Sequence, residues 1–228
     1  MGNLPQMTDP LEALRAECER TSDVVLDLPE DDFHRRTRCP EWDVKELLGH
    51  MYRDVLRVFT GLSQAAPEMA DTDSVSYWRA YAPKDDARDI ADRAKEIAAQ
   101  HQTGRDMAEA WDDLWRRSVA LAETADRARV VRTWRPTLTL DDLLRTRVLE
   151  IVVHGTDLAA ALGRPPWPTP EGLAVTNSIL LALLGSDLPG QLEWDGIMFA
   201  ERGTGRSALT ADEAGILGPA AAEFPLIS

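Results

Sequence analysis

Four long segments of this 228-residue chain place apolar side chains three or four residues apart, the spacing of one buried face of an α-helix. The first segment follows Asp9, a residue type that caps helices, and has Pro10 in its first turn. The second follows Asp43, with Glu46 three residues later, a pair typical of a capping box. Each of these segments is therefore predicted to start a helix directly after its cap.

The third and fourth segments extend the helical pattern. Residues 86–125 are predicted to be mostly helical with a break near Gly104, and a further helix opens after Thr139 and ends at Gly163. Because no strand pattern separates the four segments, we predict a mainly α fold, an antiparallel four-helix bundle over about residues 8–164. Four tryptophans are expected to be core aromatics rather than ligand-stacking residues: Trp42, Trp78, Trp111 and Trp115.

The end of the chain has a different pattern, beyond a proline-rich linker. A helix is predicted to begin at Pro170, two short strands are predicted within residues 192–210 around a Gly-Thr-Gly turn, and a last short helix precedes Gly218. We therefore divide the chain into a helical bundle, residues 1–166, and a small α+β C-terminal domain, residues 167–228.

Composition excludes several classes of function. The formal net charge of −14 leaves no basic face for phosphate contacts, so we expect no nucleic-acid partner and little attraction to anionic membranes. The longest apolar stretch, residues 178–185, is too short to span a bilayer, and the first residues do not resemble a signal peptide. Cys18 and Cys39 have no CxxC spacing and are expected to be reduced thiols. We therefore expect a cytoplasmic protein.

Glu150 and His154 form a candidate metal-binding pair. They are four residues apart, so both side chains leave one face of a helix and can reach one ion. A third candidate, His50, lies in the second helical segment, and packed helices of a bundle can bring such residues together. Two imidazoles and one carboxylate are typical protein ligands of a catalytic zinc ion that keeps an open position.

Charged residues beside these three add to the hypothesis and also offer alternatives to it. Asp54 and Asp157 are predicted to support the imidazoles from outside the metal shell, and Arg147 lies on the same flank of its helix. The alternatives are a chance Glu/His spacing, an ordinary hydrogen-bonded His50, and an ion pair between Glu150 and Arg147.

Two stretches that contain these residues resemble a known family. Residues 39–51 and 147–163 are similar to the signature stretches of the mycothiol-dependent maleylpyruvate isomerase family, part of the DinB-like superfamily of four-helix metalloproteins. The tail from residue 193 to residue 228 is similar to the small C-terminal domain of that family. The resemblance covers nearly the whole chain, but residues 64–135 match no motif.

The resemblance implies a set of functional residues. The family's metal ligands, usually of zinc, correspond to His50, Glu150 and His154. Its C-terminal arginine, which serves substrate or thiol binding near the metal, corresponds best to Arg206 and less well to Arg202. Arg206 would pair with a carboxylate or stabilise a developing enolate. The implied thiol co-substrate is mycothiol.

Several functions are compatible with these residues. The leading hypothesis is a zinc-dependent enzyme that uses mycothiol or a similar small thiol for S-transfer or thiol exchange on a small electrophile. The alternatives are a mycothiol-dependent cis–trans isomerase of the maleylpyruvate type, a non-catalytic metal- or thiol-binding stress protein, and non-haem iron chemistry. The expected partners are small molecules, and the expected state is a monomer or homodimer.

Overall fold

The computed structural model describes residues 8–80, 83–133 and 136–227, and its fold is mainly α. The α-helices of these residues are α1 (Pro10–Val25), α2 (Val44–Ser63), α3 (Ser74–Arg79), α4 (Pro83–Ala99), α5 (Gly104–Glu123), α6 (Leu140–Leu162), α7 (Pro170–Leu184), α8 (Gly196–Gly203) and α9 (Ala211–Leu217). Two 3-10 helices, η1 (Glu30–His34) and η2 (Gly218–Glu223), and two strands, β1 (Val130–Arg132) and β2 (Thr137–Thr139), complete the order.

Helices α1, α2 and α6 begin at the capping residues that the sequence predicts. Asp9 caps α1, and Asp43 forms a complete capping box with Glu46 at the start of α2. The Thr139 side chain caps α6, which ends at Gly163. That glycine has a φ of 65°, a left-handed conformation that closes helices and that other residues rarely adopt.

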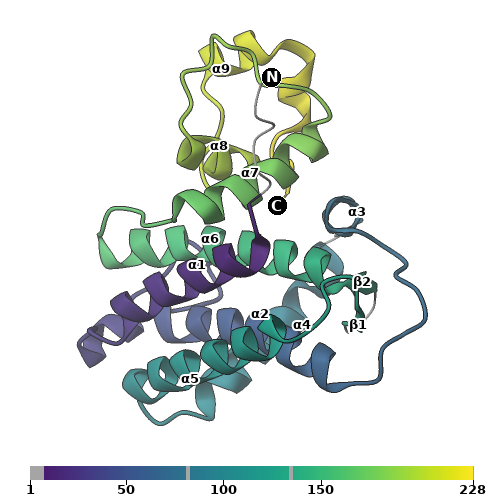
Figure 1. Ribbon diagram of the computed structural model, residues 1–228. Coiled ribbons are helices and arrows are strands. Elements are labelled where there is room, and N and C mark those ends of the chain that lie inside the picture. Colours follow the sequence, from purple (N-terminus) through teal and green to yellow (C-terminus); the bar gives the residue numbers. More distant parts are fainter. Residues whose placement is uncertain (1–7, 81–82, 134–135, 228) are drawn as a thin grey trace.

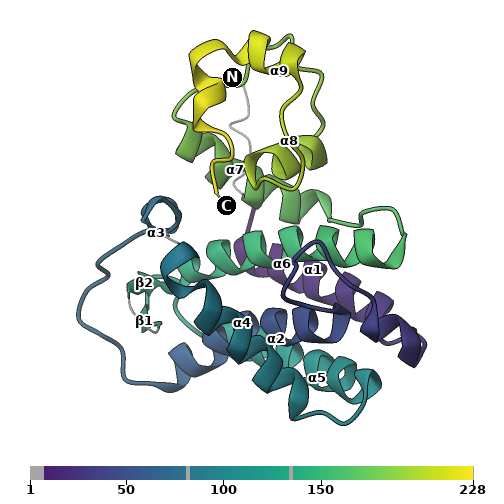
Figure 2. The same ribbon diagram turned by 180° about the vertical axis from the view of Figure 1, so that it is seen from behind.

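Helices α1, α2, α5 and α6 pack against one another, and α4 packs on α2 (Figures 1 and 2). This packing is consistent with a helical bundle. The shared core includes the fully buried side chains of Leu14, Leu48, Trp111 and Val152. A Cβ atom at Gly49 would lie 2.7 Å from the Ala94 carbonyl oxygen, so only glycine permits α2 and α4 to approach so closely.

The prediction that no strand occurs among the bundle helices is wrong. Strands β1 and β2 form an antiparallel hairpin between α5 and α6, with Val130 paired to Thr139 and Arg132 paired to Thr137. Each strand has three residues, which is too short for an alternating apolar pattern to be visible in the sequence. The short helix α3, at the same end of the bundle in Figure 1, was likewise not predicted.

The two strands predicted within residues 192–210 are also wrong, and the described part of this region contains no β-structure. Residues Gly196–Gly203 form helix α8, because the Asp195 side chain accepts a hydrogen bond from the Met198 N–H and caps the first turn. Phe199 and Ala200 form the buried face of this helix. The described region after the linker is therefore helical and not α+β. The division of the chain into two domains at residue 166 stays a prediction.

Helix α7 packs against α1 and α6, and α8 packs against α7 on the side away from the bundle core (Figures 1 and 2). The buried carboxylate of Glu17 on α1 accepts hydrogen bonds from the backbone N–H and the hydroxyl of Thr169, each at 2.6 Å. Thr169 caps α7, so Glu17 connects the N-terminus of that helix to the bundle. Among the helices of the described ranges, none is long and apolar enough to cross a membrane.

Replacement of Glu17 by glutamine is expected to change how stability depends on pH. Burial raises the pKa of Glu17 from its ordinary value near 4.5 to about 7, despite the hydrogen bonds from Thr169. Between these two values the folded state holds a proton that the unfolded state has lost, so the free energy of unfolding falls as pH rises, by up to ~3 kcal/mol. Glutamine still accepts both hydrogen bonds but does not titrate. Denaturant unfolding at pH 4.5 and 7.5 should therefore show a smaller fall for Glu17→Gln, and an equal fall in both proteins would contradict the assignment.

Candidate metal centre

The structure brings His50, Glu150 and His154 together between two helices. His50 lies on α2, and the other two residues lie one turn apart on α6. The Glu150 Oε2 atom is 3.5 Å from His50 Nε2 and 3.3 Å from His154 Nε2, and one donor atom from each residue lies within 4.8 Å of the other two. The two imidazole rings meet edge to face, with 4.8 Å between their centres.

These donors fit a divalent cation. Ligands about 2.1 Å from a tetrahedral zinc ion lie about 3.4 Å from one another, close to the separations between Glu150 and each imidazole nitrogen. Two nitrogen donors and one carboxylate oxygen suit a borderline ion and leave a fourth position for another ligand. The role of these residues as ligands stays a prediction, but their positions are those that such a site requires.

The electrostatics of the group favour a charged carboxylate in a buried setting. Burial opposes ionisation of Glu150, but hydrogen bonds with His154 and His50 outweigh burial and hold the pKa of Glu150 well below its usual range. Burial likewise lowers the pKa of His154, but its bonds to Asp157 and Glu150 outweigh burial and raise the pKa well above the usual value. The Glu150 carboxylate is therefore charged and contacts both imidazoles in a largely buried site. A buried negative charge of this kind is stable only beside a positive charge or hydrogen-bond donors.

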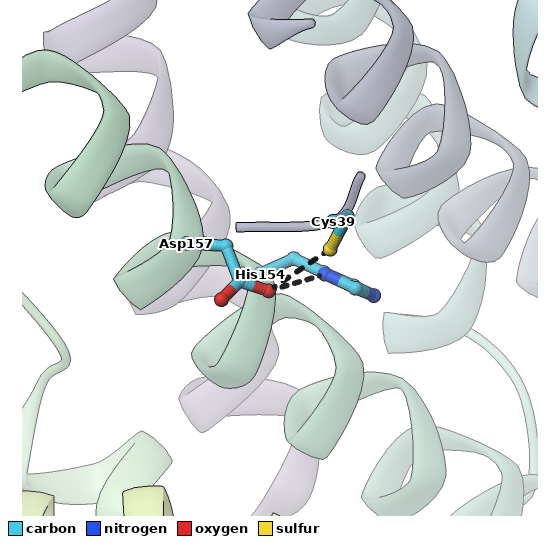
Figure 3. A group of neighbouring side chains, drawn as sticks. All are labelled: Cys39, His154 and Asp157. Carbon is cyan, nitrogen blue, oxygen red and sulfur yellow. Dashed lines mark hydrogen bonds and ion pairs between the residues drawn. The ribbon is translucent and has the colours of Figure 1, made fainter. Parts of the chain in front are cut away.

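Asp157 bonds to His154 through the ring nitrogen that does not face Glu150, and its role outside a metal shell stays a prediction. Its Oδ2 atom is 3.0 Å from His154 Nδ1 (Figure 3). The other ring nitrogen, Nε2, is therefore left to face Glu150, whose Oε2 atom is 3.3 Å away. The fully buried Asp157 carboxylate also accepts hydrogen bonds from Arg38 at 3.1 Å and from Arg206 at 3.0 and 3.3 Å. Burial raises the pKa of Asp157, but its interaction with His154 and then the charge and hydrogen bonds of Arg206 outweigh burial and hold the pKa well below its usual range. Asp157 therefore joins three parts of the chain beside the candidate metal ligands.

A second group of potential metal donors, Cys39, His154 and Asp157, is less suited to a cation. The Cys39 thiol lies 3.5 Å from Asp157 Oδ2 and donates to it (Figure 3). Because Arg38 and Arg206 already bond to this carboxylate, a cation added there would lie close to two positive charges. Of the two donor groups in the described ranges, the one with Glu150 is therefore the better metal site.

Asp54 lies beside the His50 imidazole. The sequence predicts that it supports an imidazole from outside the metal shell. Its Oδ2 atom lies 3.2 Å from His50 Nε2, the nitrogen that also faces Glu150, so that supporting role stays a prediction. Its other oxygen accepts a hydrogen bond from Arg147, a fully buried guanidinium that also contacts the Tyr77 hydroxyl. Arg147 therefore forms its ion pair with Asp54 on the other helix. An ion pair between Arg147 and Glu150, one of the alternatives to a metal site, is not the contact that Arg147 makes.

Trp42 holds His50 in place by ring stacking. The two rings are 4.8 Å apart and inclined by 24°, and the indole N–H donates to the Ala91 carbonyl at 3.4 Å. The edge of Trp42 also contacts His154. The four tryptophans predicted as core residues are all buried, but Trp42 and Trp78 additionally line a cavity next to the metal ligands.

This cavity has a volume of about 590 Å³, and the metal-ligand group forms part of its wall. Arg206 lines it, whereas Arg202 bonds to Glu213 at 3.1 Å and does not. The preference for Arg206 over Arg202 therefore agrees with their positions. Arg38 also lines the cavity, but the sequence did not predict it. It lies in a connector that also contains Arg35 and Arg36, and no sequence pattern distinguishes one of these arginines from the others.

Comparison with known proteins identifies one family. The model of the family described as the mycothiol maleylpyruvate isomerase N-terminal domain matches residues 14–159, which include all three candidate ligands. No curated protein and no solved structure matches the chain.

Replacement of Glu150 by glutamine is expected to remove stoichiometric zinc binding, because the neutral amide is a poor ligand. The loss of affinity should exceed the roughly 10–100-fold effect of losing a residue outside the metal shell. Competition with a chromophoric chelator measures it. Glu109→Gln, on the exposed face of α5, is the matched control and should bind zinc as the unmodified chain does. Equal affinities of the two variants would exclude Glu150 as a ligand.

Replacement of Asp157 by asparagine is expected to weaken zinc binding by roughly 10–100-fold, because His154 loses a charged partner that orients its ring. The same chelator competition applies, with thermal melting to establish that the variant is folded. Asp141→Asn removes a partly exposed carboxylate on the same helix and should leave the zinc affinity unchanged. A folded Asp157→Asn protein with normal affinity would show that Asp157 does not support the site.

Proposed function

The chain belongs to the mycothiol maleylpyruvate isomerase N-terminal domain family, and on this premise we propose that it is a zinc-dependent enzyme that uses a small thiol, mycothiol or a close analogue. The proposed reaction is transfer of the thiol to a small electrophile, or exchange of thiols on it. The observation that carries the proposal is the position of His50, Glu150 and His154 in the wall of a cavity large enough for small molecules.

Each residue of the site has a proposed part. His50, Glu150 and His154 would hold the zinc ion, which when bound would lower the pKa of a coordinating thiol from its free value of about 8.5. Asp157 orients His154, and Trp42 restrains His50. These contacts fix the donor positions before any substrate arrives, which reduces the reorganisation needed during the reaction.

Arg206 would donate hydrogen bonds to a polar group of the thiol or to a carboxylate of the substrate. Its guanidinium bonds to Asp157 and to the Thr204 carbonyl, which fixes it at the cavity wall, and about a fifth of its side chain stays exposed. A planar guanidinium has five N–H donors, so a carboxylate can still bind to those not used in these bonds. Arg38 is fixed by the same carboxylate and is a second donor at this wall.

The bond changes in the proposed transfer are simple. The sulfur forms a bond to the electrophilic carbon, the bond from that carbon to the leaving group breaks, and its electron pair departs with the leaving group. The thiol proton goes to solvent. Exclusion of bulk water by the apolar part of the cavity would favour attack by sulfur over hydrolysis.

Cis–trans isomerisation is the second candidate, because the matched family is named after an isomerase of maleylpyruvate. The same sulfur would add to a double-bond carbon, rotation would follow, and elimination of that sulfur would restore the double bond. A non-catalytic protein that only binds metal or thiol remains the candidate from a different class.

Assay of the zinc-loaded protein with mycothiol separates these candidates. A bimane alkylating reagent that becomes fluorescent on S-alkylation should react faster with protein and mycothiol together than with either alone. His50→Ala should lose this acceleration, because it removes one proposed ligand, and His34→Ala, an exposed histidine on η1, should keep it. Conversion of maleylpyruvate to fumarylpyruvate, without net use of mycothiol, would favour the isomerase.

Zinc binding without acceleration for any electrophile or thiol would contradict the enzyme and leave a binding protein. Iron as the bound metal, with oxygen consumption, would indicate the non-haem iron alternative.

A further inference from the structure

Apart from the candidate metal ligands, the described charged residues that line the cavity come from two segments, the connector before α2 and the turn after α8. Arg38 and Glu41 lie on the connector before α2, and Arg206 lies just after α8. Arg38 and Arg206 share the carboxylate of Asp157, so these two guanidiniums lie side by side. Glu41 is exposed and pairs with Lys95 at 3.4 Å, which places it at the rim.

Among the side chains that the structure describes, which on α4 begin at Ala87, the lining residues from α3, α4 and the C-terminal tail are uncharged. Trp78 lies on α3, Ile90 and Ala91 lie on α4, and Pro225 and Ile227 lie in the tail. Trp78, Pro225 and Ile227 also line a neighbouring cavity of about 330 Å³, so these three residues lie close together. This group of five residues forms an apolar wall of the cavity, and none of its side chains carries a charge that could pair with a substrate carboxylate.

The apolar wall points to the class of electrophile. We propose that the electrophile carries an uncharged apolar body, an aromatic ring in particular, which lies against the apolar wall while the polar groups of the thiol face Arg38 and Arg206. This inference rests on the proposed function and names its substrate class. An aromatic ring gains free energy when it covers apolar side chains, whereas a carboxylate at that wall loses its hydration without a paired donor.

A binding titration with saturating mycothiol, whose polar groups would face Arg38 and Arg206, tests the inference without turnover, because neither probe carries a leaving group. Calorimetry on the full-length chain as purified compares 2-naphthylmethanol with 6-(hydroxymethyl)-2-naphthoate, which differ by one carboxylate. The uncharged compound should bind at least about 10-fold more tightly, because the carboxylate must be desolvated. Equal or tighter binding of the naphthoate would overturn the inference, and so would failure of both compounds to bind.

Variants of Ile90 locate the bound ring. Ile90 is half-buried, and Ile90→Asp and the milder Ile90→Asn should weaken 2-naphthylmethanol binding about 10-fold, whereas Ile90→Leu should not. Ile216→Asp, at an exposed apolar residue on α9 that does not line the cavity, is the matched control. Unchanged binding in a folded Ile90→Asn protein would contradict the proposed location.

A kinetic comparison then connects the wall to the reaction. With zinc and mycothiol, kcat/KM for benzyl bromide should exceed that for 4-(bromomethyl)benzoate by at least about 10-fold. Turnover that prefers the benzoate would overturn the inference but keep the thiol transferase. Selective naphthylmethanol binding without turnover would keep the apolar site and contradict the proposed function, so the two failures are distinguishable.

Discussion

The buried ion pair between Arg147 and Asp54 joins the two helices that carry the candidate metal ligands. Asp54 is one turn beyond His50 on α2, and Arg147 is one turn before Glu150 on α6. Burial of both charges is tolerable only while they stay paired, so a shift of one helix along the other would leave an unpaired charge in the core. This requirement fixes the alignment of α2 and α6, and the short distances from Glu150 to both imidazoles depend on that alignment.

A second constraint operates at the other end of the site. The carboxylate of Asp157 bonds to His154 and to two arginines from distant parts of the chain, Arg38 and Arg206. The connector before α2 and the segment after α8 are therefore positioned by the helix that carries two of the three candidate ligands. The family match ends at residue 159, and part of the cavity wall comes from residues beyond it, among them Arg206.

Some residues of the cavity wall belong to the hydrophobic core and to the candidate site at the same time. Trp42 was expected to be an ordinary core residue, and it is buried, yet it also stacks on His50 and lines the cavity. A buried aromatic ring can restrain a ligand and exclude water at the same time. The short helix α3 and the C-terminal tail contribute Trp78 and Ile227 to the same space, and the helical pattern of the sequence predicts neither contact.

The sequence by itself determined the long helices, because caps such as Asp43 with Glu46 and the apolar spacing are local signals that every helix must satisfy. It also selected His50, Glu150 and His154 as candidate metal ligands, since one-turn spacing and resemblance to a family both operate on short stretches, and the structure brings these three residues together. The sequence failed for the hairpin β1–β2 and for α8, where a few residues carry too weak a pattern. Only the tertiary structure decided that Arg38 joins Arg206 in the cavity wall and that Arg147 pairs with Asp54. These contacts join residues far apart in the chain, and their energies depend on burial and distance, which no local pattern encodes.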